Sequence, residues 1–435
     1  MMELKDLRDL YACPCDETAM YKPFMVPSTG RGHLVWFEGE EEPYLDLVLG
    51  FSCLNFGHCE PAITAAVKEA AEQLAHIHSF NTRPKLELSQ RLNDIFEDEL
   101  GTRQNYQIHF EVGGSNAVDA SVLLARHATG KSAFIRCAGS FHGCNYGSAW
   151  LSDNCFVDHN QYQKLPGNSL TIPYPDQQIP GASEACLESL QTLITSRNDI
   201  AAIIIEPVLG AGGIRLPDPD CLRKIREITK ENGIFYIDDE IQMGVGRTGF
   251  FFATAHYGII PDIILLGKSL AGGFSPISAV LASKNIFQKM PIQRTGFQGT
   301  FANHAFGSAI ANRTIEWAVT EKLFCPKKPI GQRLLKLIQE LAEIYDFLSM
   351  PRGLGMALAI DVSKTQKGSI IKADPHLAAQ IVKIGLENKV ILYCCGTQGN
   401  TLKLFPRINA TEEEADLIEA RLRTIFKQTM QSLHA

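Results

Sequence analysis

Short runs of apolar residues alternate with helix-like segments through the first two thirds of the chain. The runs occupy residues 106–110, 133–136, 201–205, 234–237 and 263–266. Between them, residues 117–128, 184–193 and 222–232 repeat apolar side chains every three or four positions, which predicts helices with one buried face. A run that is apolar at every position, such as 201–205, predicts a strand covered on both sides. The alternation therefore predicts an α/β fold in which a mostly parallel sheet lies between helices.

The two ends of the chain follow different patterns. Residues 33–37 and 44–48 predict a hairpin around Gly39, and residues 61–76 predict a helix with Pro61 in its first turn. After about Val319, helical patterns at 329–345, 375–387 and 412–427 are interspersed with strand-like segments at 355–360, 390–393 and 402–405. We therefore expect an N-terminal segment 1–60, a large domain 61–319 and a small α+β domain 320–435, with the N-terminal segment packed against the small domain.

Composition and charge narrow the function classes. Of the 435 residues 45% are apolar and 20% charged, and the net charge of −7 lacks the basic balance of a nucleic-acid-binding protein. No apolar run reaches the ~18 residues of a membrane span, and the charged residues 1–10 do not resemble a signal peptide. The twelve cysteines form no CxxC or Cys/His zinc spacing, so we expect free thiols, no bound metal and a cytoplasmic location.

Three of the apolar runs are followed closely by a charged residue: Glu206, Asp239 and Lys268. Ligands of open α/β sheets bind outside the carboxyl ends of the strands, so these three side chains are expected to converge on one crevice. Asp238 and Glu240 flank Asp239 and should point to the opposite face of the strand. A structural ion pair at the edge of the sheet is the alternative interpretation.

A glycine-rich turn and a nearby aromatic residue add a binding site for a flat, phosphorylated molecule. Gly114 and Ser115 lie where a predicted strand passes into a helix, and the free N–H groups of a helix N-terminus favour a phosphate. Phe141 and His142 follow the next strand and are placed to stack on a heterocycle. Pyridoxal phosphate (PLP) requires a lysine for its aldehyde, a carboxylate for its pyridine nitrogen and an anion hole for its phosphate. The chain supplies all three.

Two segments carry a resemblance to a known family. Residues 239–249 (Asp-Glu-Ile-Gln-Met-Gly-Val-Gly-Arg-Thr-Gly) resemble the signature of the class III, or ω-type, aminotransferases, and residues 261–273 (Pro-Asp-Ile-Ile-Leu-Leu-Gly-Lys-Ser-Leu-Ala-Gly-Gly) are similar to their lysine segment. The resemblance extends from about Gly30 to the C-terminal helix. It implies a PLP enzyme of fold type I, a homodimer with shared active sites, and transfer of an amino group from an amino donor to a keto acid.

The resemblance also implies a role for each matching residue. Lys268 would carry the cofactor as a Schiff base and shuttle protons, and Asp239 would pair with the pyridine nitrogen. The remaining contacts would be with the phosphate (Gly114, Ser115, and Thr300 of the neighbouring subunit), the ring (Phe141, supported by His142), the phenolic oxygen (Gln242) and the side of the pocket (Glu206).

Two positions depart from the family pattern together. Many relatives have a glutamate that gates an arginine for the substrate α-carboxylate; here Ala211 stands for the glutamate and Lys403 for the arginine. Lys403 can still bind a carboxylate as a point charge, and Arg407 and Arg294 are alternative anchors. The arginine that γ-aminobutyrate enzymes have after the His-Gly pair is Cys144 here.

The finer resemblance is to the diaminobutyrate–2-oxoglutarate transaminases, through Asn116, Lys403 and residues 54–58 (Leu-Asn-Phe-Gly-His). It implies 2,4-diaminobutyrate as donor and 2-oxoglutarate as acceptor. Two other functions stay open. A racemase, epimerase or aminomutase of the same fold would use Lys268 and Asp239 for proton transfer alone, and a non-catalytic homologue would act as a binding protein.

Overall fold

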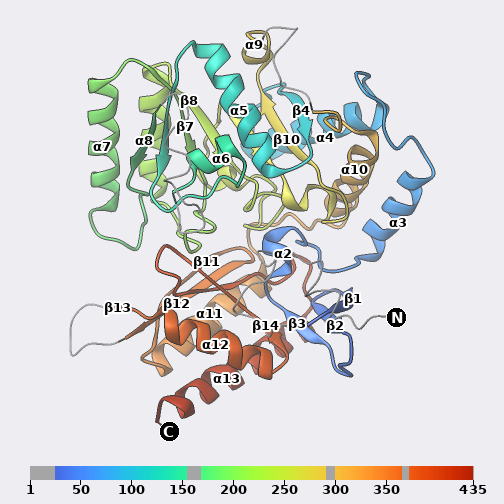
Figure 1. Cartoon of the computed structure of the whole chain (residues 1–435), viewed down its shortest axis with the longest axis vertical. Coiled ribbons are helices and arrows are strands. Elements are labelled where there is room, and N and C mark those ends of the chain that lie inside the picture. Colours follow the sequence, from blue (N-terminus) through green and yellow to red (C-terminus); the bar gives the residue numbers. More distant parts are fainter. Residues whose placement is uncertain (1–24, 154–167, 291–298, 365–371, 435) are drawn as a thin grey trace, which may run out of the picture.

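A seven-stranded sheet occupies the upper part of the computed structural model, which describes residues 25–153, 168–290, 299–364 and 372–434 (Figure 1). The strand order is β4-β10-β9-β8-β7-β5-β6. The strands are β4 (Gln107–Glu111), β5 (Ala133–Cys137), β6 (Ser169–Ile172), β7 (Ile200–Ile205), β8 (Phe235–Asp239), β9 (Ile263–Leu266) and β10 (Ser278–Ala282). Strands β9, β8, β7, β5 and β6 pair in parallel, whereas β10 is antiparallel to both of its neighbours. The mostly parallel sheet predicted from the sequence is confirmed.

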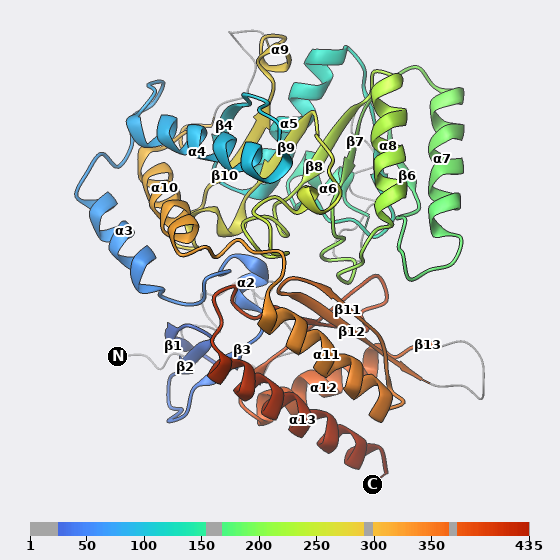
Figure 2. The same cartoon turned by 180° about the vertical axis from the view of Figure 1, so that it is seen from behind.

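Helices cover both faces of this sheet, as the two opposite views show (Figures 1 and 2). Each face has its own apolar cluster: Ile204 of β7 packs with α5, whereas Ile203 and Ile205 pack with α7 and α8. The helices of this part are α3 (Pro61–Ala71), α4 (Arg83–Leu100), α5 (Gly114–Thr129), α6 (Tyr146–Leu151), α7 (Ala182–Ser196), α8 (Pro219–Glu231), α9 (Lys284–Phe287) and α10 (Ala305–Thr320). Because β7 contributes apolar side chains to both faces, its sequence contains no polar residue.

Helix α8 illustrates how the sequence sets the bounds of an element. The carboxylate of Asp218 accepts hydrogen bonds from the N–H groups of Asp220 and Cys221, which would otherwise lack partners in the first helical turn. Pro219 follows at the first helical position, where its missing N–H costs nothing. Leu222 and Ile225 then form the buried face against the sheet.

Two smaller sheets, the short helix α2 (Leu49–Ser52) and the helices of the C-terminal part form the lower part of the molecule (Figure 1). One sheet has the order β1-β2-β3-β14, and the other has β11-β12-β16-β15 with β13 paired to β12. Its elements are β1 (Pro27–Arg31), β2 (Leu34–Phe37), β3 (Tyr44–Asp46), β11 (Leu348–Leu354), β12 (Ala357–Lys364), β13 (Lys372–Ala373), β14 (Val390–Ile391), β15 (Tyr393–Cys395), β16 (Thr401–Leu404), α11 (Pro329–Ile344), α12 (Pro375–Glu387) and α13 (Glu412–His434). Strand β3 pairs with β14, and Leu45 and Leu47 join the core of the C-terminal helices. The domain bounds drawn from the sequence stay predictions.

Several elements differ from the sequence-based expectation. The helix expected over 61–76 ends at Ala71, and the single strand expected over 390–393 is two strands that pair in different sheets, β14 with β3 and β15 with β16. Helices α4 and α10 and strand β10 were not predicted. Within the described segments no disulfide joins the cysteines, and no helix combines the length and the apolar character needed to cross a membrane.

Candidate active site

A cavity lies at the carboxyl ends of β7, β8 and β9, where parallel α/β sheets bind ligands. Its lining comes from segments far apart in the sequence: Gly114, Ser115, Phe141, His142, Gly143, Glu206, Ala211, Asp239, Ile241, Gln242 and Lys268. Every residue that the sequence assigned to the cofactor is among them except Thr300. The alternative of a simple ion pair at the sheet edge does not account for a cavity with this lining.

Asp239 ends β8 with its carboxylate buried, at 4% exposure. Oδ2 lies 2.6 Å from Nδ1 of His142, and Oδ1 accepts a hydrogen bond from the N–H of Ile241 at 3.1 Å. The imidazole is itself buried, and the N–H of His142 donates to Oγ of Ser152 at 2.9 Å. These contacts fix the orientation of the carboxylate at the floor of the cavity and leave it further capacity to accept a proton donor.

Lys268 begins the short 3₁₀ helix η4 (Lys268–Ala271), two positions beyond the end of β9. Its φ of 41° lies in the left-handed region, a conformation that is unfavourable for residues with a Cβ. Ser269, the next residue, accepts a hydrogen bond on its hydroxyl from the N–H of Asn55 at 3.2 Å, which helps to hold the turn in place. The amine of Lys268 is half-buried and lines the same cavity as Asp239.

Glu206 stands beyond the end of β7 and is almost fully buried. Its carboxylate accepts hydrogen bonds from the N–H groups of Phe141 and Gly210, both at 2.9 Å. Burial raises the pKa of Glu206 above its usual value, and the nearby Asp239 adds to the rise. Through these hydrogen bonds Glu206 connects the turn at Phe141 with the loop that follows β7, and both segments line the cavity.

The helix N-terminus of α5 forms the other end of the cavity. Gly114 approaches Ile241 so closely that a Cβ at this position would lie 2.9 Å from Cγ2 of the isoleucine. Gly143 has a φ of 134°, and a Cβ there would lie 2.3 Å from Oγ of Ser115. A side chain at either position would force Ile241 or Ser115 to move, so glycine allows this close packing at the N-terminus of α5.

Lys403 of β16 does not line the cavity, but it contacts Gln242, which does. Lys403 is 2% exposed, and its ammonium lies 3.3 Å from Oε1 of Gln242 and 4.9 Å from the centre of the Phe405 ring. Burial holds the pKa of Lys403 below its usual value. Neither neighbour is a carboxylate, so among the described residues this buried cation has polar contact only with a neutral amide.

The other candidate anchors are placed differently. The guanidinium of Arg407 makes two hydrogen bonds from Nε to Glu414, at 3.0 and 2.9 Å, and lies 3.6 Å from Glu60, so its charge is already neutralised outside the cavity. Thr300 is exposed and does not line the cavity of its own chain. Arg294 lies outside the described residues.

Neither Asp238, on β8, nor Glu240, directly after the strand, lines the cavity, as strand alternation predicts. Glu240 accepts hydrogen bonds from the N–H groups of Ala253 and Thr254 at 2.9 and 2.7 Å. Burial and the nearby Glu240 raise the pKa of Asp238 well above its usual value. Within the described ranges, no three side chains of the metal-ligating types come together to hold an ion.

Sequence reasoning missed three residues that shape the cavity. Ile241 lies two positions after Asp239 and Gly143 directly follows His142, so the neighbouring motifs carried the available signal. Phe51 gave no signal: its carbonyl accepts a hydrogen bond from Nε2 of Gln242 at 3.2 Å, and its ring lies 4.7 Å from that of Tyr393.

Comparisons with known proteins point to one family. The sequence model of the class III aminotransferases matches residues 17–426. The chain is 31% identical over 402 residues to the 5-aminovalerate aminotransferase of Pseudomonas putida, and the alignment covers 91% of each chain. It is 30% identical over 389 residues to the 4-aminobutyrate aminotransferase of Escherichia coli, with 88% of each chain covered. The solved structure of an amine transaminase from an uncultivated Pseudomonas species, in its PLP-bound form, is 25% identical, with a TM-score of 0.83 over 95% of this chain and 99% of that one.

Proposed function

Because the chain belongs to the class III aminotransferase family and is a PLP-dependent transaminase, we propose that it transfers the terminal amino group of a short amino acid to a keto acid. The donor that we propose is 2,4-diaminobutyrate and the acceptor is 2-oxoglutarate. The relatives named above are aminotransferases for 5-aminovalerate and 4-aminobutyrate, both of which carry a terminal amine. The observation that carries the substrate proposal is the buried ammonium of Lys403, which makes no direct hydrogen bond or salt bridge to a carboxylate among the described residues.

The residues of the cavity fit PLP. When bound, PLP supplies an electron sink for the electrons left at the substrate carbon. We assign Lys268 the covalent attachment of the cofactor and the movement of the substrate proton, and Asp239 the task of keeping the pyridine nitrogen protonated, with His142 holding its carboxylate. The N-terminus of α5 at Gly114 and Ser115 would take the phosphate, because its N–H groups and dipole favour a dianion.

Three further residues complete the proposed cofactor site. Phe141 would stack on the ring, Gln242 would lie near the phenolic oxygen, and Glu206 would close the side of the pocket. The hydrogen bonds that Glu206 accepts from Phe141 and Gly210 support this arrangement, because they fix the turn that carries the aromatic ring.

The proposal is tested by assaying the purified enzyme with 2,4-diaminobutyrate and 2-oxoglutarate and measuring glutamate. A transaminase of this specificity forms one glutamate for each donor that is consumed. A racemase or an aminomutase would convert the donor without consuming any keto acid. A non-catalytic homologue would leave both substrates unchanged.

Replacing Lys403 by alanine should raise the KM for 2-oxoglutarate while leaving the cofactor bound. Losing a hydrogen bond to a charged group is worth roughly 1.5–3 kcal/mol, which corresponds to about a 10- to 100-fold rise in KM. Arginine at this position should preserve binding, because it keeps the positive charge.

The matched comparison is Arg407→Ala. Since Arg407 already pairs with Glu414 and Glu60, this variant should lower stability without changing the acceptor KM. A large rise in KM for Arg407→Ala together with a normal KM for Lys403→Ala would contradict the assignment.

We further propose that the enzyme is a homodimer in which Thr300 completes the phosphate site of the partner subunit. The exposure of Thr300 and its absence from the cavity of its own chain support this role. Thr300→Ala should weaken PLP retention in equilibrium dialysis by about 10- to 100-fold, the equivalent of one hydrogen bond to a charged group. Thr195→Ala on the exposed side of α7 serves as the control. A fully active monomer in sedimentation measurements would refute the shared site.

A further inference from the structure

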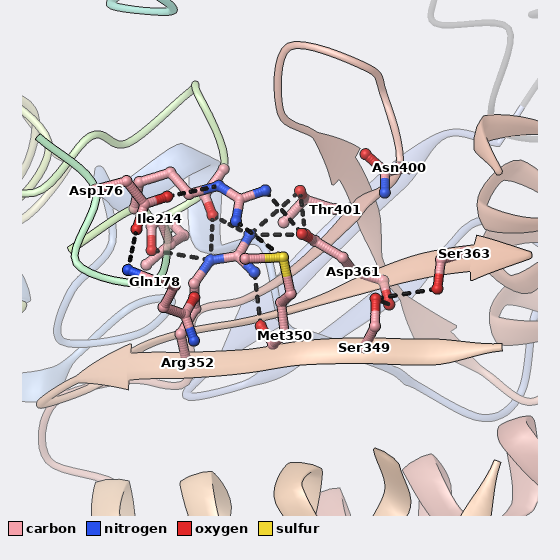
Figure 3. A network of polar contacts seen from close by, with 12 residues as sticks. Asp176, Gln178, Ile214, Ser349, Met350, Arg352, Asp361, Ser363, Asn400 and Thr401 are labelled. Atoms are coloured by element: carbon pink, nitrogen blue, oxygen red, sulfur yellow. Dashed lines mark hydrogen bonds and ion pairs between the residues drawn. The ribbon is translucent and has the colours of Figure 1, made fainter. Parts of the chain in front are cut away.

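The loop between β7 and α8 forms one wall of the cavity and lies against the C-terminal sheet (Figure 3). Leu209 and Arg215 close the loop by exchanging two backbone hydrogen bonds of 3.0 and 3.1 Å, and Ala211 lines the cavity from within it. The N–H of Gly396 donates to the carbonyl of Ala211 at 3.0 Å, so the contact with the C-terminal sheet extends to the wall itself.

Strand β16 forms the opposite side of this contact. Thr401 and Lys403 are two positions apart and therefore share one face of the strand. Thr401 meets the loop, since a Cβ on Gly213 would lie 3.0 Å from its hydroxyl oxygen. Lys403 therefore lies on the same face of β16 as the residue that contacts the loop.

Arg352 of β11 is the residue that joins the two sides. Its side chain is buried, at 3% exposure for the residue, and most of its contacts are with the loop and with its own sheet. The guanidinium donates to the carbonyls of Gly213 (2.9 Å), Ile214 (3.2 Å) and Met350 (2.7 Å), to the carboxylate of Asp361 (2.7 Å) and to the hydroxyl of Thr401 (3.4 Å).

Asp361 of β12 holds this guanidinium in place. It also accepts hydrogen bonds from the hydroxyl of Thr401 at 2.6 Å and from Nη2 of Arg215 at 2.7 Å. One buried carboxylate therefore binds both Arg352, which donates to carbonyls in the middle of the loop, and Arg215, which lies at its end. A planar guanidinium can satisfy several acceptors at once, whereas a lysine ammonium cannot reproduce this geometry.

The backbone of the gripped segment is strained. Gly213 has a φ of 115° and Ile214 a φ of 54°, and the second value is costly for a β-branched residue. Such conformations persist only when the surroundings hold them. Arg352 donates hydrogen bonds to the carbonyls of these two residues. The contacts that join the loop to the sheet therefore also stabilise its strained backbone.

We propose that Arg352 is a positioning residue for substrate binding, which holds the loop 209–215 against β16 so that Ala211 and Lys403 face the substrate at a fixed spacing. The proposal rests on the proposed function, in which Lys403 binds the carboxylate of the acceptor. Arg352 itself would touch neither substrate nor cofactor.

The test is the holoenzyme variant Arg352→Lys. The KM for 2-oxoglutarate and the inhibition constant of glutarate, a dicarboxylate with no keto group, should both rise by roughly 10- to 100-fold, the loss expected when a hydrogen bond to a charged group is broken. The kcat at saturating acceptor and the absorption of the bound cofactor should change little. A merely structural role would lower the melting temperature without this split between KM and kcat.

Arg226→Lys is the matched control. Arg226 makes a bidentate pair with Asp262 at 2.7 and 2.9 Å, near the amino ends of β8 and β9 and away from the cavity. It should lose stability and retain the wild-type KM. If Arg352→Lys has the same melting temperature as this control and a normal glutarate inhibition constant, the positioning role is refuted.

A second pair of variants covers the case in which Arg352→Lys does not fold. Gly213→Ala presses a methyl group against Thr401 and should raise the same two constants. Gly233→Ala has a similarly positive φ of 60° but opens onto empty space, so it should leave them unchanged. Equal constants in Gly213→Ala and Gly233→Ala would overturn the proposal. A wild-type enzyme that does not use 2-oxoglutarate and is not inhibited by glutarate would instead refute the proposed acceptor.

Discussion

Replacing Lys268 by alanine should abolish transamination while the protein keeps its fold. Lys268 is the amine that lines the cavity on a strained turn directly after β9, and no other described residue places an amine at that strand end. Proton transfer by a positioned side chain alone contributes about 10²- to 10⁴-fold to a rate, and loss of covalent attachment adds to this deficit. Stopped-flow measurement of amino transfer, with the melting temperature measured in parallel, gives both readouts.

Two further variants identify the chemistry that is lost. Lys268→Arg keeps the positive charge but cannot attach an aldehyde in the same way, so it should be as inactive as the alanine variant. Lys289→Ala, at an exposed position after α9, should behave like the wild type. Substantial turnover in Lys268→Arg would mean that the lysine acts through its charge alone, which would contradict the assignment.

Asp239→Asn should lower kcat by about two orders of magnitude. A buried, charge-assisted hydrogen bond is worth roughly 1.5–3 kcal/mol, and each tenfold loss in rate corresponds to about 1.4 kcal/mol. The amide is isosteric with the carboxylate, so the contact with His142 at 2.6 Å and the fold should be retained. Steady-state kinetics at saturating donor and acceptor measures the effect.

Asp238→Asn is the control for this prediction. Asp238 lies on the same strand and is fully buried, but it does not line the cavity, and burial raises its pKa above the usual value. An amide should therefore replace it with little effect on turnover. If Asp239→Asn is as active as Asp238→Asn, Asp239 does not support the cofactor.

The central sheet and the position of the site could be predicted because both depend on local sequence. Strands such as β7 are apolar throughout, so the first polar residue after each strand stands out, and the topology of parallel sheets brings these strand ends together. Glu206, Asp239 and Lys268 therefore lie in one cavity. The antiparallel strand β10 and the two strands over 390–395 depend on pairing between distant segments, which the local pattern does not contain.

Which cation is free to bind a substrate could not be predicted for the same reason. Lys403 and Arg407 are separated by only three residues, yet Arg407 turns to Glu414 and Glu60, whereas Lys403 meets a neutral amide. Arg352 gave no signal at all, because its partners come from the loop after β7, from β12 and from β16. Long-range contacts of this kind exist only in the folded chain.

Borohydride reduction followed by peptide mass mapping determines which residue carries pyridoxal phosphate. Borohydride converts the carbon–nitrogen double bond between the cofactor and its lysine into a stable single bond, so the modified residue survives digestion. We expect the phosphopyridoxyl group on the peptide that contains Lys268, in the wild type and in Lys403→Ala alike. If the group appeared on Lys403 or on any other lysine, Lys268 would not be the residue that binds the cofactor.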